Sequence, residues 1–593
     1  MAVKSKQPEV LIPENLSWPE FVFQDFKEYE HRTAIVCSST KRKYTFSQVK
    51  DLSIKLASAL SKRGIKKGDV IAIFAPNVPE YAIVFLGALQ MGGVVTGVNP
   101  LFTSDELTNQ LKEANAKCVF TVHQLAHRAE EAARKLVMEH VFVIGDDQDD
   151  DNCDSVSVLF KDDGSEFPLI TFHPRDDLAI LPFSSGAGGL PRGVMLTHYN
   201  LVALGCIVSA NGFLDFKEKA SEQKSTIFSV IPFHRTFGMI AVLSLALRHG
   251  STLISMPRFD QNKLFPLLQD YKVTHLISEA SVVHLLSNNP AVDNFNLTSL
   301  VEVMSCASVL GPETSRNVKK RLPQLRRISQ CYGMTEITGM SHVTPPVDTK
   351  HGSVGVLLPN LECKVCEVST GEVLGAGARG EIWVRGPTVM KGYLNNQDAS
   401  DQMIDHSGWL HTGDIGYYDD DEHFFIVDIL KNVIKFKGHQ VSPSELESLL
   451  RAHPAIKDAA VIGIPDPEVG ELPMAYIVGE NEEDLTEIEV MQYVDENAAP
   501  HKKLRGGVVF IPTLPKTADG EVLRTELKEK LIQGKYKPVQ MRRAFVFPTE
   551  DKRFSLKRHS LGPRIFARNN DTILEDLEEK PREMTRSKSC LIL

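Results

Sequence analysis

A glycine-rich stretch carries the first residues of the sequence that could do chemistry. The stretch SSGAGGLPRGV (residues 184–194) follows the apolar run LAILPF and contains two serines, four glycines and one cation, Arg192. Backbone N–H groups in such a loop can bind an anion such as phosphate. The stretch matches neither the G-x-x-x-x-G-K-S/T loop nor the G-x-G-x-x-G fingerprint of nucleotide-binding proteins. Its residues alone therefore leave two interpretations open, an anion-binding loop and an ordinary glycine hairpin.

The hydrophobic pattern predicts the elements that position this loop. Up to about residue 428, β-branched runs such as VIAIFAP, CVFTV and HVFVIG alternate with amphipathic helical stretches, which favours α/β layers with largely parallel sheets. The loop should lie between two short strands, and Thr197 should cap the helix that follows. The long uncharged run 81–104 is interrupted by Gly-Gly and Asn-Pro, so we expect a buried helix, a turn and a buried strand there and no membrane span.

The later part of the sequence follows a different pattern. Residues 380–430 are rich in strands. A compact segment follows from Lys431 to about Val539, with helices expected to begin near Ser442 and Thr486. We interpret this last segment as a small α+β domain.

Composition limits the class of protein. A chain of 593 residues is too long for one hydrophobic core, so two or more domains are expected. The net charge of −10 disfavours nucleic acid as a partner. Nine cysteines without an apolar leader segment predict a reducing, intracellular compartment and no secretion. Cys363 and Cys366 lack the second pair that a metal site needs, so we interpret them as small buried apolar residues.

Six further motifs follow the glycine-rich loop in a fixed order. They are QCYGMTE (330–336), GSVGVLLPN (352–360), GEIWVRGPTVMKGYLNN (380–396), GWLHTGDIGYYD (408–419), IKFKGHQVSPSELE (434–447) and LPKTADGEVLR (514–524). Together with the loop they closely resemble the adenylate-forming (AMP-binding) superfamily, specifically the 4-coumarate–CoA ligases and beetle luciferases. The stretches PFHRTFGM and KKLRGGVVF are more similar to the luciferase branch.

This resemblance implies a fold and an activity. The fold is α/β, with a large N-terminal AMP-binding domain (1–428) of stacked α/β sheets plus a β-barrel-like part, and a small mobile α+β C-terminal domain (429–540). Enzymes of this family join a carboxylic acid to ATP, which gives an acyl-adenylate and pyrophosphate, and then transfer the acyl group to coenzyme A. ATP, Mg²⁺ and coenzyme A are therefore the implied cofactors, and a fatty or aryl acid is the implied substrate.

The resemblance also assigns nucleotide-binding residues. Thr335 would contact phosphate and Glu336 would hold magnesium, which prefers oxygen ligands. Tyr332 would stack against adenine, and Asp414 would accept hydrogen bonds from both ribose hydroxyls. The loop would cover the β- and γ-phosphates, and the remaining nucleotide-binding positions are Ser184, Ser185, Gly186, Ala187, Gly188, Gly189 and Ser308.

Further residues are assigned to the acyl pocket and to domain rotation. Lys431 would be the hinge between two domain orientations, and Lys435 would face the site during thioester formation. The resemblance places four residues in the acyl pocket, namely His234, Arg235, Phe237 and Cys306.

Five departures from the family pattern fall on positions that touch the reaction. Ala187 and Gly188 remove two hydroxyl donors to phosphate, and Arg192 replaces a lysine with a differently shaped cation. Arg235 replaces a pocket histidine, and Ile429 replaces an arginine that approaches the ribose. Glu521 replaces the lysine that bridges the substrate carboxylate and the α-phosphate during adenylation.

The change at Glu521 reverses a charge next to two anions. Two unit charges about 4 Å apart interact by roughly 4 kcal/mol at an effective dielectric constant of about 20. That energy corresponds to roughly three orders of magnitude in rate, as an upper limit, since the residue lies on a mobile domain. We therefore predict that adenylation through the standard route is weak or absent.

Three functions follow from these departures. In the first, the protein is an acid–CoA ligase that recruits another cation, with Arg235 and Lys516 as candidates. In the second, it is a pseudoenzyme that keeps a pocket for nucleotide or acyl-CoA and serves as a scaffold or sensor. A luciferase-like monooxygenase is the third, and Arg235 disfavours it because a histidine of the luciferin pocket is missing.

Residues 541–593 differ in character from the rest of the sequence. Residues 542–568 hold eight Lys or Arg against two acids, an acidic stretch follows, and low apolar content predicts a disordered tail. CLIL (590–593) matches the C-a-a-X pattern for geranylgeranylation of Cys590 by a prenyltransferase. The basic run 552–568 would supply the second signal for an anionic membrane surface. We expect attachment to a cytoplasmic membrane face, and the peroxisomal ending S-K-L is absent.

The membrane prediction can be tested with Cys590→Ser. Removing the thiol removes the site of lipid attachment, so the variant should move from the membrane fraction to the supernatant in cell fractionation. A variant that stays in the membrane fraction would contradict the prediction.

Overall fold

The structure is a computed structural model, and it describes most of the chain. The described residues are 2–145, 154–185, 191–210, 212–214, 216, 225–306, 310–347, 349–368, 370–429, 434–437, 439–441, 443–480, 485–516 and 522–534. Several predicted site residues lie outside them, namely Gly186, Ala187, Gly188, Gly189, Ser308, Lys431, Glu521 and Cys590. The chain divides into a unit Met1–Phe545 and a unit Val546–Leu593, and all described residues belong to the first.

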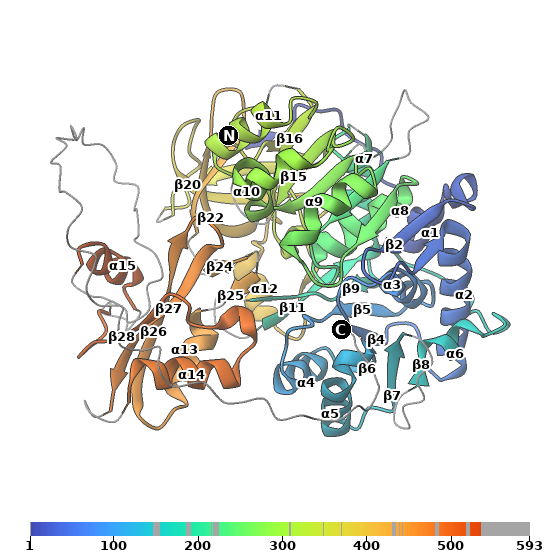
Figure 1. Cartoon of the computed structure of the whole chain (residues 1–593), viewed down its shortest axis with the longest axis horizontal. Coiled ribbons are helices and arrows are strands. Elements are labelled where there is room, and N and C mark those ends of the chain that lie inside the picture. The colour runs from blue at the N-terminus through green and yellow to red at the C-terminus, as the bar shows by residue number, and fades with distance from the viewer. Residues whose placement is uncertain are drawn as a thin grey trace, which may run out of the picture. The chain divides into compact units, whose positions relative to one another are not determined.

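The first nine-stranded sheet contains the two strands on either side of the glycine-rich stretch. Its strand order is β10-β11-β9-β5-β4-β6-β7-β8, with β21 paired to β11. Figure 1 labels β4 to β9 and β11 of this sheet. The bounds are β4 Val70–Phe74, β5 Val94–Gly97, β6 Ala116–Val122, β7 His140–Ile144, β8 Asp154–Ser155, β9 Leu178–Ile180, β10 Phe183–Ser185, β11 Pro191–Thr197 and β21 Gly392–Tyr393. Strands β4 to β9 pair in parallel, and β10 and β11 form an antiparallel hairpin.

The second nine-stranded sheet has a parallel centre. Its order is β18-β17-β16-β15-β14-β12-β13-β2-β3, and β2, β13, β12, β14, β15 and β16 pair in parallel. The bounds are β2 Thr33–Cys37, β3 Lys43–Thr45, β12 Thr226–Ser229, β13 Thr252–Ser255, β14 His275–Glu279, β15 Glu302–Cys306, β16 Arg327–Tyr332, β17 His342–Val343 and β18 Val356–Leu357. The alternating pattern thus gives two largely parallel sheets, as expected.

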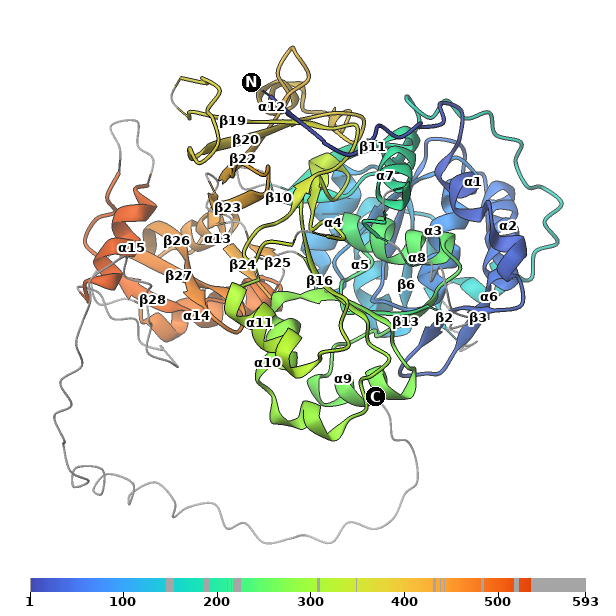
Figure 2. The same ribbon diagram turned by 90° about the horizontal axis from the view of Figure 1, so that it is seen from above.

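Helices cover these sheets. Helices α4 and α5 lie together beside β6 and β7, and α10 packs with α11 beside β14 and β15 (Figures 1 and 2). The bounds are α1 Trp18–Phe23, α2 Phe46–Lys62, α3 Glu80–Gln90, α4 Ser104–Glu113, α5 Ala126–Leu136, α6 Val156–Phe160, α7 His198–Ala210, α8 Leu245–Arg248, α9 Gln261–Asp270, α10 Ala280–Asn288, α11 Pro312–Arg321 and α12 Gln397–Met403.

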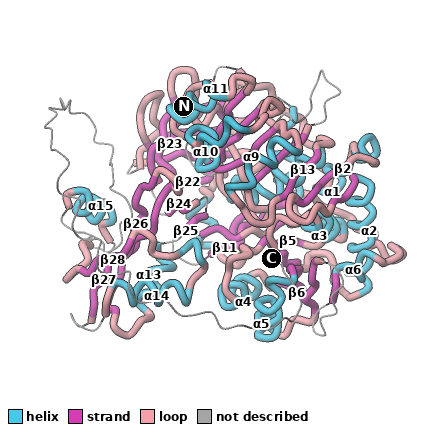
Figure 3. The backbone as a smooth tube through the Cα atoms, viewed as in Figure 1, coloured by secondary structure: helices cyan, strands magenta, loops and turns pink. Residues whose placement is uncertain are grey.

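Two smaller sheets follow in the chain (Figure 3). An antiparallel five-stranded sheet has the order β1-β19-β20-β22-β23, with β1 Val3–Lys4, β19 Glu362–Cys366, β20 Gly380–Arg385, β22 Leu410–Tyr418 and β23 Phe424–Ile429. The last sheet has the order β25-β24-β27-β26 with β28 beside β27, and its bounds are β24 Ile434–Phe436, β25 His439–Val441, β26 Ile456–Asp466, β27 Gly470–Gly479 and β28 Gly507–Phe510. Three helices accompany it, α13 Pro443–Arg451, α14 Glu487–Asn497 and α15 Arg524–Ile532.

Several local predictions are confirmed. The run 81–104 forms α3, a turn at Gly92 with φ +77°, and β5. Helix α7 begins after Thr197, whose hydroxyl accepts a hydrogen bond from the Asn200 N–H at 3.2 Å. Among the described residues, no helix is both long enough and apolar enough to cross a membrane.

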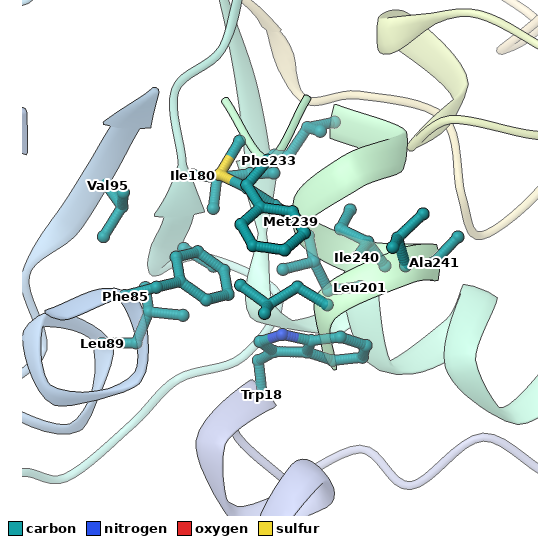
Figure 4. Close-up of a cluster of buried hydrophobic side chains, with 14 of the residues drawn as sticks. Trp18, Phe85, Leu89, Val95, Ile180, Leu201, Phe233, Met239, Ile240 and Ala241 are labelled. Atoms are coloured by element: carbon teal, nitrogen blue, oxygen red, sulfur yellow. The ribbon is translucent and has the colours of Figure 1, made fainter. Parts of the chain in front are cut away.

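Buried apolar residues anchor the loop 231–237, which follows β12. Phe233 and Met239 lie in one cluster with Trp18 and Leu201 (Figure 4), and all four side chains are at most 1% exposed. The side chain of Asn77 also holds this loop through two hydrogen bonds. It donates to the Ile231 carbonyl at 2.9 Å and accepts from the Phe233 N–H at 2.8 Å. The loop is therefore fixed on both sides of His234 and Arg235.

The end of β5 lies directly against this loop. A Cβ atom on Gly97 would lie 2.5 Å from the carbonyl oxygen of His234 and 2.8 Å from its Cα. Both atoms belong to the backbone, so the two segments can approach this closely only because residue 97 has no side chain.

Gly97→Ala should therefore destabilise the protein. Forcing the loop away from β5 should cost about 1–3 kcal/mol and lower the midpoint of urea unfolding. Gly375→Ala is the matched control, because its Cβ would meet no atom within 4 Å, and its midpoint should stay unchanged. Equal midpoints for the two variants would contradict the close contact.

Candidate active site

A cavity of about 260 Å³ opens at the carboxyl ends of strands from both nine-stranded sheets. Parallel α/β sheets bind ligands at this edge. Seven residues that the sequence predicted for the site line it, namely Ser184, His234, Arg235, Phe237, Cys306, Thr335 and Lys435. The cavity thus brings together residues that are far apart in the sequence.

The hairpin β10–β11 places the predicted phosphate loop beside Glu336, the predicted magnesium ligand. Ser184 and Arg192 pair across the hairpin, which places the two ends of the loop next to each other. The Ser184 hydroxyl donates to Glu336 Oε1 at 2.8 Å, and the Tyr393 hydroxyl donates to the same oxygen at 2.9 Å. The Arg192 guanidinium lies 5.3 Å from the centre of the Tyr393 ring. The loop therefore begins beside a buried carboxylate.

Glu336 and Thr335 fit a magnesium ion that is shared with a phosphate ligand. Glu336 is 4% exposed, and burial and the neighbouring Glu336 raise the pKa of Tyr393, so the phenol stays a hydrogen-bond donor. Within the described part of the chain, no group of three or more His, Cys, Asp or Glu could hold a metal by itself. One carboxylate plus a hydroxyl matches the way Mg²⁺ binds, with substrate oxygens and water completing its shell.

Tyr332 and Asp414 form the predicted adenosine end of the site. The Tyr332 hydroxyl donates to Asp414 Oδ2 at 2.7 Å. Burial, with help from Asp414, raises the pKa of Tyr332 well above its usual range, so this phenol is protonated. The strand register places Ile429 opposite Asp414, which is where the sequence predicted the loss of an arginine. These residues meet although they are distant in the chain.

The loop 231–237 brings a partly buried cation, Arg235, into the cavity wall. The Thr236 hydroxyl contacts the Thr335 hydroxyl at 3.5 Å, so the loop touches the predicted phosphate-binding residue. The neighbouring Arg235 has Glu279 as its carboxylate partner, with Nη1 and Oε1 3.8 Å apart, which is too long for a hydrogen bond. Burial raises the pKa of Glu279 to about 7, although Arg235 opposes this shift. The guanidinium is therefore only weakly compensated.

A second segment, residues 435–502, completes the wall of the cavity. Lys435 of β24 lies in the lining, as the resemblance implies for the thioester-forming state. Lys502 is buried, and its Nζ lies 2.6 Å from Glu106 Oε1 and 2.5 Å from Glu445 Oε1. Glu106 also accepts from the Thr103 N–H at 2.9 Å in the capping box that begins α4. The Glu106 carboxylate thus caps the start of α4 and also binds Lys502 of the second segment.

Comparison with known proteins assigns the family. The family model of the AMP-binding enzymes matches residues 22–394, and the model of their C-terminal domain matches residues 445–521. The chain belongs to the AMP-binding enzymes. It is 37% identical over 536 residues to 4-coumarate–CoA ligase 1 of Petroselinum crispum, covering 90% of this chain and 97% of that protein.

Solved structures of this family share the fold. The chain resembles a long-chain-fatty-acid–CoA ligase (FadD1) from Archaeoglobus fulgidus with a TM-score of 0.70 and 26% identity, covering 86% of this chain and 99% of that one. It also resembles o-succinylbenzoate CoA synthetase (MenE) from Bacillus subtilis, bound with a product analogue, with a TM-score of 0.74 and 24% identity over 88% and 99% of the two chains. The fold predicted from the motifs, a large N-terminal part of stacked sheets and a smaller C-terminal part, is confirmed, and the domain boundaries at 428 and 540 stay predictions.

Some residues in and around this cavity were not found from the sequence. Asn77, Glu106, Glu279 and Lys502 support the cavity or line it. Two of them could have been found from their positions. Asn77 and Glu279 lie where a parallel strand ends, which is the edge of a sheet that binds ligands. The contact of Glu106 with Lys502 joins residues almost 400 positions apart, which no local pattern shows.

Two imidazoles in this AMP-binding enzyme stay neutral near pH 7. His439 and His501 stack with their ring centres 4.5 Å apart. Burial lowers the pKa of His501 to about 3, with further contributions from Lys502 and Arg235. Burial and Arg235 likewise hold the pKa of His439 well below its usual value. The stack therefore adds no positive charge beside Arg235.

The role of Lys502 can be tested with Lys502→Met. The variant leaves the partly buried carboxylates of Glu106 and Glu445 without this cation. Breaking a fully buried pair costs about 3–5 kcal/mol unless the segments separate, which is the upper limit here. Amide hydrogen exchange in α4 and around residues 500–505 should then rise at least about tenfold.

Lys503→Met is the matched control for this prediction. Lys503 pairs with the exposed Asp495 at 2.8 Å, and exposed pairs contribute little. The amide hydrogen exchange rates of Lys503→Met in α4 and around residues 500–505 should match those of the unmodified protein. If Lys502→Met also left the rates unchanged, the buried contact would not hold the second segment in place.

Proposed function

We propose that the protein is an ATP-dependent acid–CoA ligase in which Arg235 takes over part of the role of the missing adenylation lysine. A fatty or aryl carboxylic acid is the proposed substrate, with ATP, Mg²⁺ and coenzyme A. The observation that carries this proposal is the position of Arg235, a partly buried cation in the cavity wall whose own carboxylate partner lies 3.8 Å away.

Arg235 is better placed than the other candidate cation. Lys516 Nζ lies 2.6 Å from Asp458 Oδ2, and Lys516 is not among the residues that line the cavity. Arg235 is followed by Thr236, which contacts Thr335. A carboxylate bound by Arg235 would thus lie next to the residue proposed to contact phosphate.

In the first step, a carboxylate oxygen of the acid attacks the α-phosphorus of ATP, and pyrophosphate leaves. Arg235 would hold the attacking carboxylate and offset the negative charge that builds up between the two anions. Ser184, Arg192 and Thr335 would donate hydrogen bonds to phosphate oxygens, and Asp414 beside Tyr332 would hold the ribose. When bound at Glu336, Mg²⁺ would supply further positive charge at the phosphates.

In the second step, the thiol of coenzyme A attacks the acyl carbon, and AMP leaves. Lys435 lines the cavity and would contact the acyl-adenylate during this step. Its ammonium group would stabilise the negative charge that develops on the reacting oxygen. The closed contact of Lys502 with Glu106 would keep water out of the cavity.

A pseudoenzyme is the second candidate. The substitutions at Ala187, Gly188 and Glu521 all weaken the adenylation step, whereas Lys435 is kept. Such a protein would bind nucleotide or acyl-CoA in the same cavity and act as a scaffold or sensor.

An assay of acid-dependent pyrophosphate release separates the two candidates. The full-length protein is mixed with ATP, Mg²⁺ and a panel of fatty and aryl acids. Slow but acid-dependent release is expected, and Glu521→Lys should accelerate it by about 10- to 1,000-fold because it restores the attraction and removes the repulsion. Glu521→Gln, which only removes the charge, should give a smaller increase.

Variants in the cavity identify the cation. Arg235→Met should slow pyrophosphate release, Arg235→Lys should restore part of it, and Lys435→Met should slow acyl transfer to coenzyme A more than pyrophosphate release. An unchanged rate of pyrophosphate release in Arg235→Met would overturn the assignment of Arg235 as the recruited cation. ATP binding in calorimetry without turnover, in both the unmodified protein and Glu521→Lys, would favour the pseudoenzyme.

A further inference from the structure

Two thiols lie side by side in the cavity wall. Strands β15 and β16 are parallel neighbours, and their register pairs Ser305 with Gln330. The next residue of each strand is a cysteine, Cys306 and Cys331, and both line the cavity. Both are free thiols.

The spacing of the two strands suits a disulfide bond. Neighbouring strands of a sheet lie about 4.8 Å apart, and disulfides usually join Cα atoms separated by about 4.4–6.8 Å. Cys306 and Cys331 occupy matching positions, so their side chains leave the sheet on the same face. A bond between the sulfurs would need little movement of the backbone.

The two thiols differ in their surroundings. Cys306 is 4% exposed, and its Sγ donates to the Ser278 carbonyl at 3.3 Å. The neighbouring Cys331, together with burial, keeps the pKa of Cys306 well above its usual value, so this thiol stays protonated. Cys331 is only partly buried and faces the cavity. A small reagent that enters the cavity therefore meets Cys331 first.

We propose that Cys306 and Cys331 form a redox site that a small hydroperoxide converts to a disulfide. The sulfur of Cys331 attacks one peroxide oxygen and the O–O bond breaks, which gives a sulfenic acid at Cys331 and one water when the hydroperoxide is hydrogen peroxide. The sulfur of Cys306 then attacks the sulfenic sulfur, the S–O bond breaks, and the thiol proton leaves with the hydroxyl as a second water. Two thiols are oxidised to one disulfide and one peroxide is reduced to two waters.

The redox state of these two cysteines would affect the wall of the cavity. Cys331 directly precedes Tyr332, whose hydroxyl binds Asp414. Cys306 ends β15 in the wall that also contains Arg235. A disulfide would tie these two parts of the wall together, and a dithiol reductant would release them. This inference goes beyond the proposed function and does not depend on it, because the bond can be measured without turnover.

Another pair of cysteines provides an internal control. Cys363 and Cys366 lie three residues apart on the single strand β19, so their side chains point to opposite faces of the sheet. Trypsin separates all four residues, since Cys306 falls in peptide 273–316, Cys331 in 328–350, Cys363 in 351–364 and Cys366 in 365–379.

The test maps disulfides in the full-length protein after treatment with hydrogen peroxide. The protein is denatured, its remaining thiols are blocked with N-ethylmaleimide, and it is digested with trypsin without reductant. We expect peptides 273–316 and 328–350 to appear joined, with a mass two hydrogens below their sum, at least about tenfold more than any 351–364/365–379 product. Dithiothreitol should remove the joined species. Oxidation of Cys331 without a joined species, or a yield equal to that of the control pair, would overturn the proposal.

Two variants test the order of the steps. In Cys306→Ser the sulfenic acid at Cys331 has no resolving thiol, so dimedone should label Cys331 at least about tenfold more than in the unmodified protein. In Cys331→Ser, Cys306 should be recovered as the reduced thiol after the same treatment. Rapid oxidation of Cys306 in Cys331→Ser would overturn the assignment of Cys331 as the attacking thiol.

Discussion

The contact between Gly97 and the backbone of His234 holds the site together. Gly97 ends β5 in one nine-stranded sheet, and His234 lies in the loop that follows β12 in the other. The contact therefore joins the carboxyl ends of two sheets, which is where the cavity opens. Asn77 and the buried side chains of Phe233 and Met239 fix the same loop (Figure 4). The contacts of Thr236 with Thr335 and of Arg235 with Glu279 depend on this arrangement.

Most buried charges around the cavity have close partners. Glu336 accepts hydrogen bonds from two hydroxyl groups, and Lys502 lies within 2.6 Å of two carboxylates. Arg235 differs, because its carboxylate partner lies 3.8 Å away. Since a partly buried charge with only a distant partner is costly, a site that leaves one in a cavity wall is suited to an anionic ligand. This contrast is the main physical support for an acid as the substrate.

The local elements around the site could be predicted from the sequence. The hairpin at Ser184 and Arg192, the cap at Thr197 and the helix-turn-strand of residues 81–104 follow from turn chemistry and hydrophobic patterns, which act over a few residues. Some of the residues that the motifs assign to the site line one cavity, namely Ser184, Arg235, Thr335 and Lys435. The departure at Glu521 is visible only in the sequence, since that residue lies outside the described part of the chain.

The sequence by itself determined the family, the order of the elements and the departures from the family motifs, because motifs and single residues are read directly along the chain. Only the tertiary structure decided which charges are paired. Lys502 and Glu106, Arg235 and Glu279, and Cys306 and Cys331 come together through strand register and loop packing. A pattern of a few residues carries no information about contacts between sheets. The preference for Arg235 over Lys516 as the recruited cation therefore came from the packing of the fold.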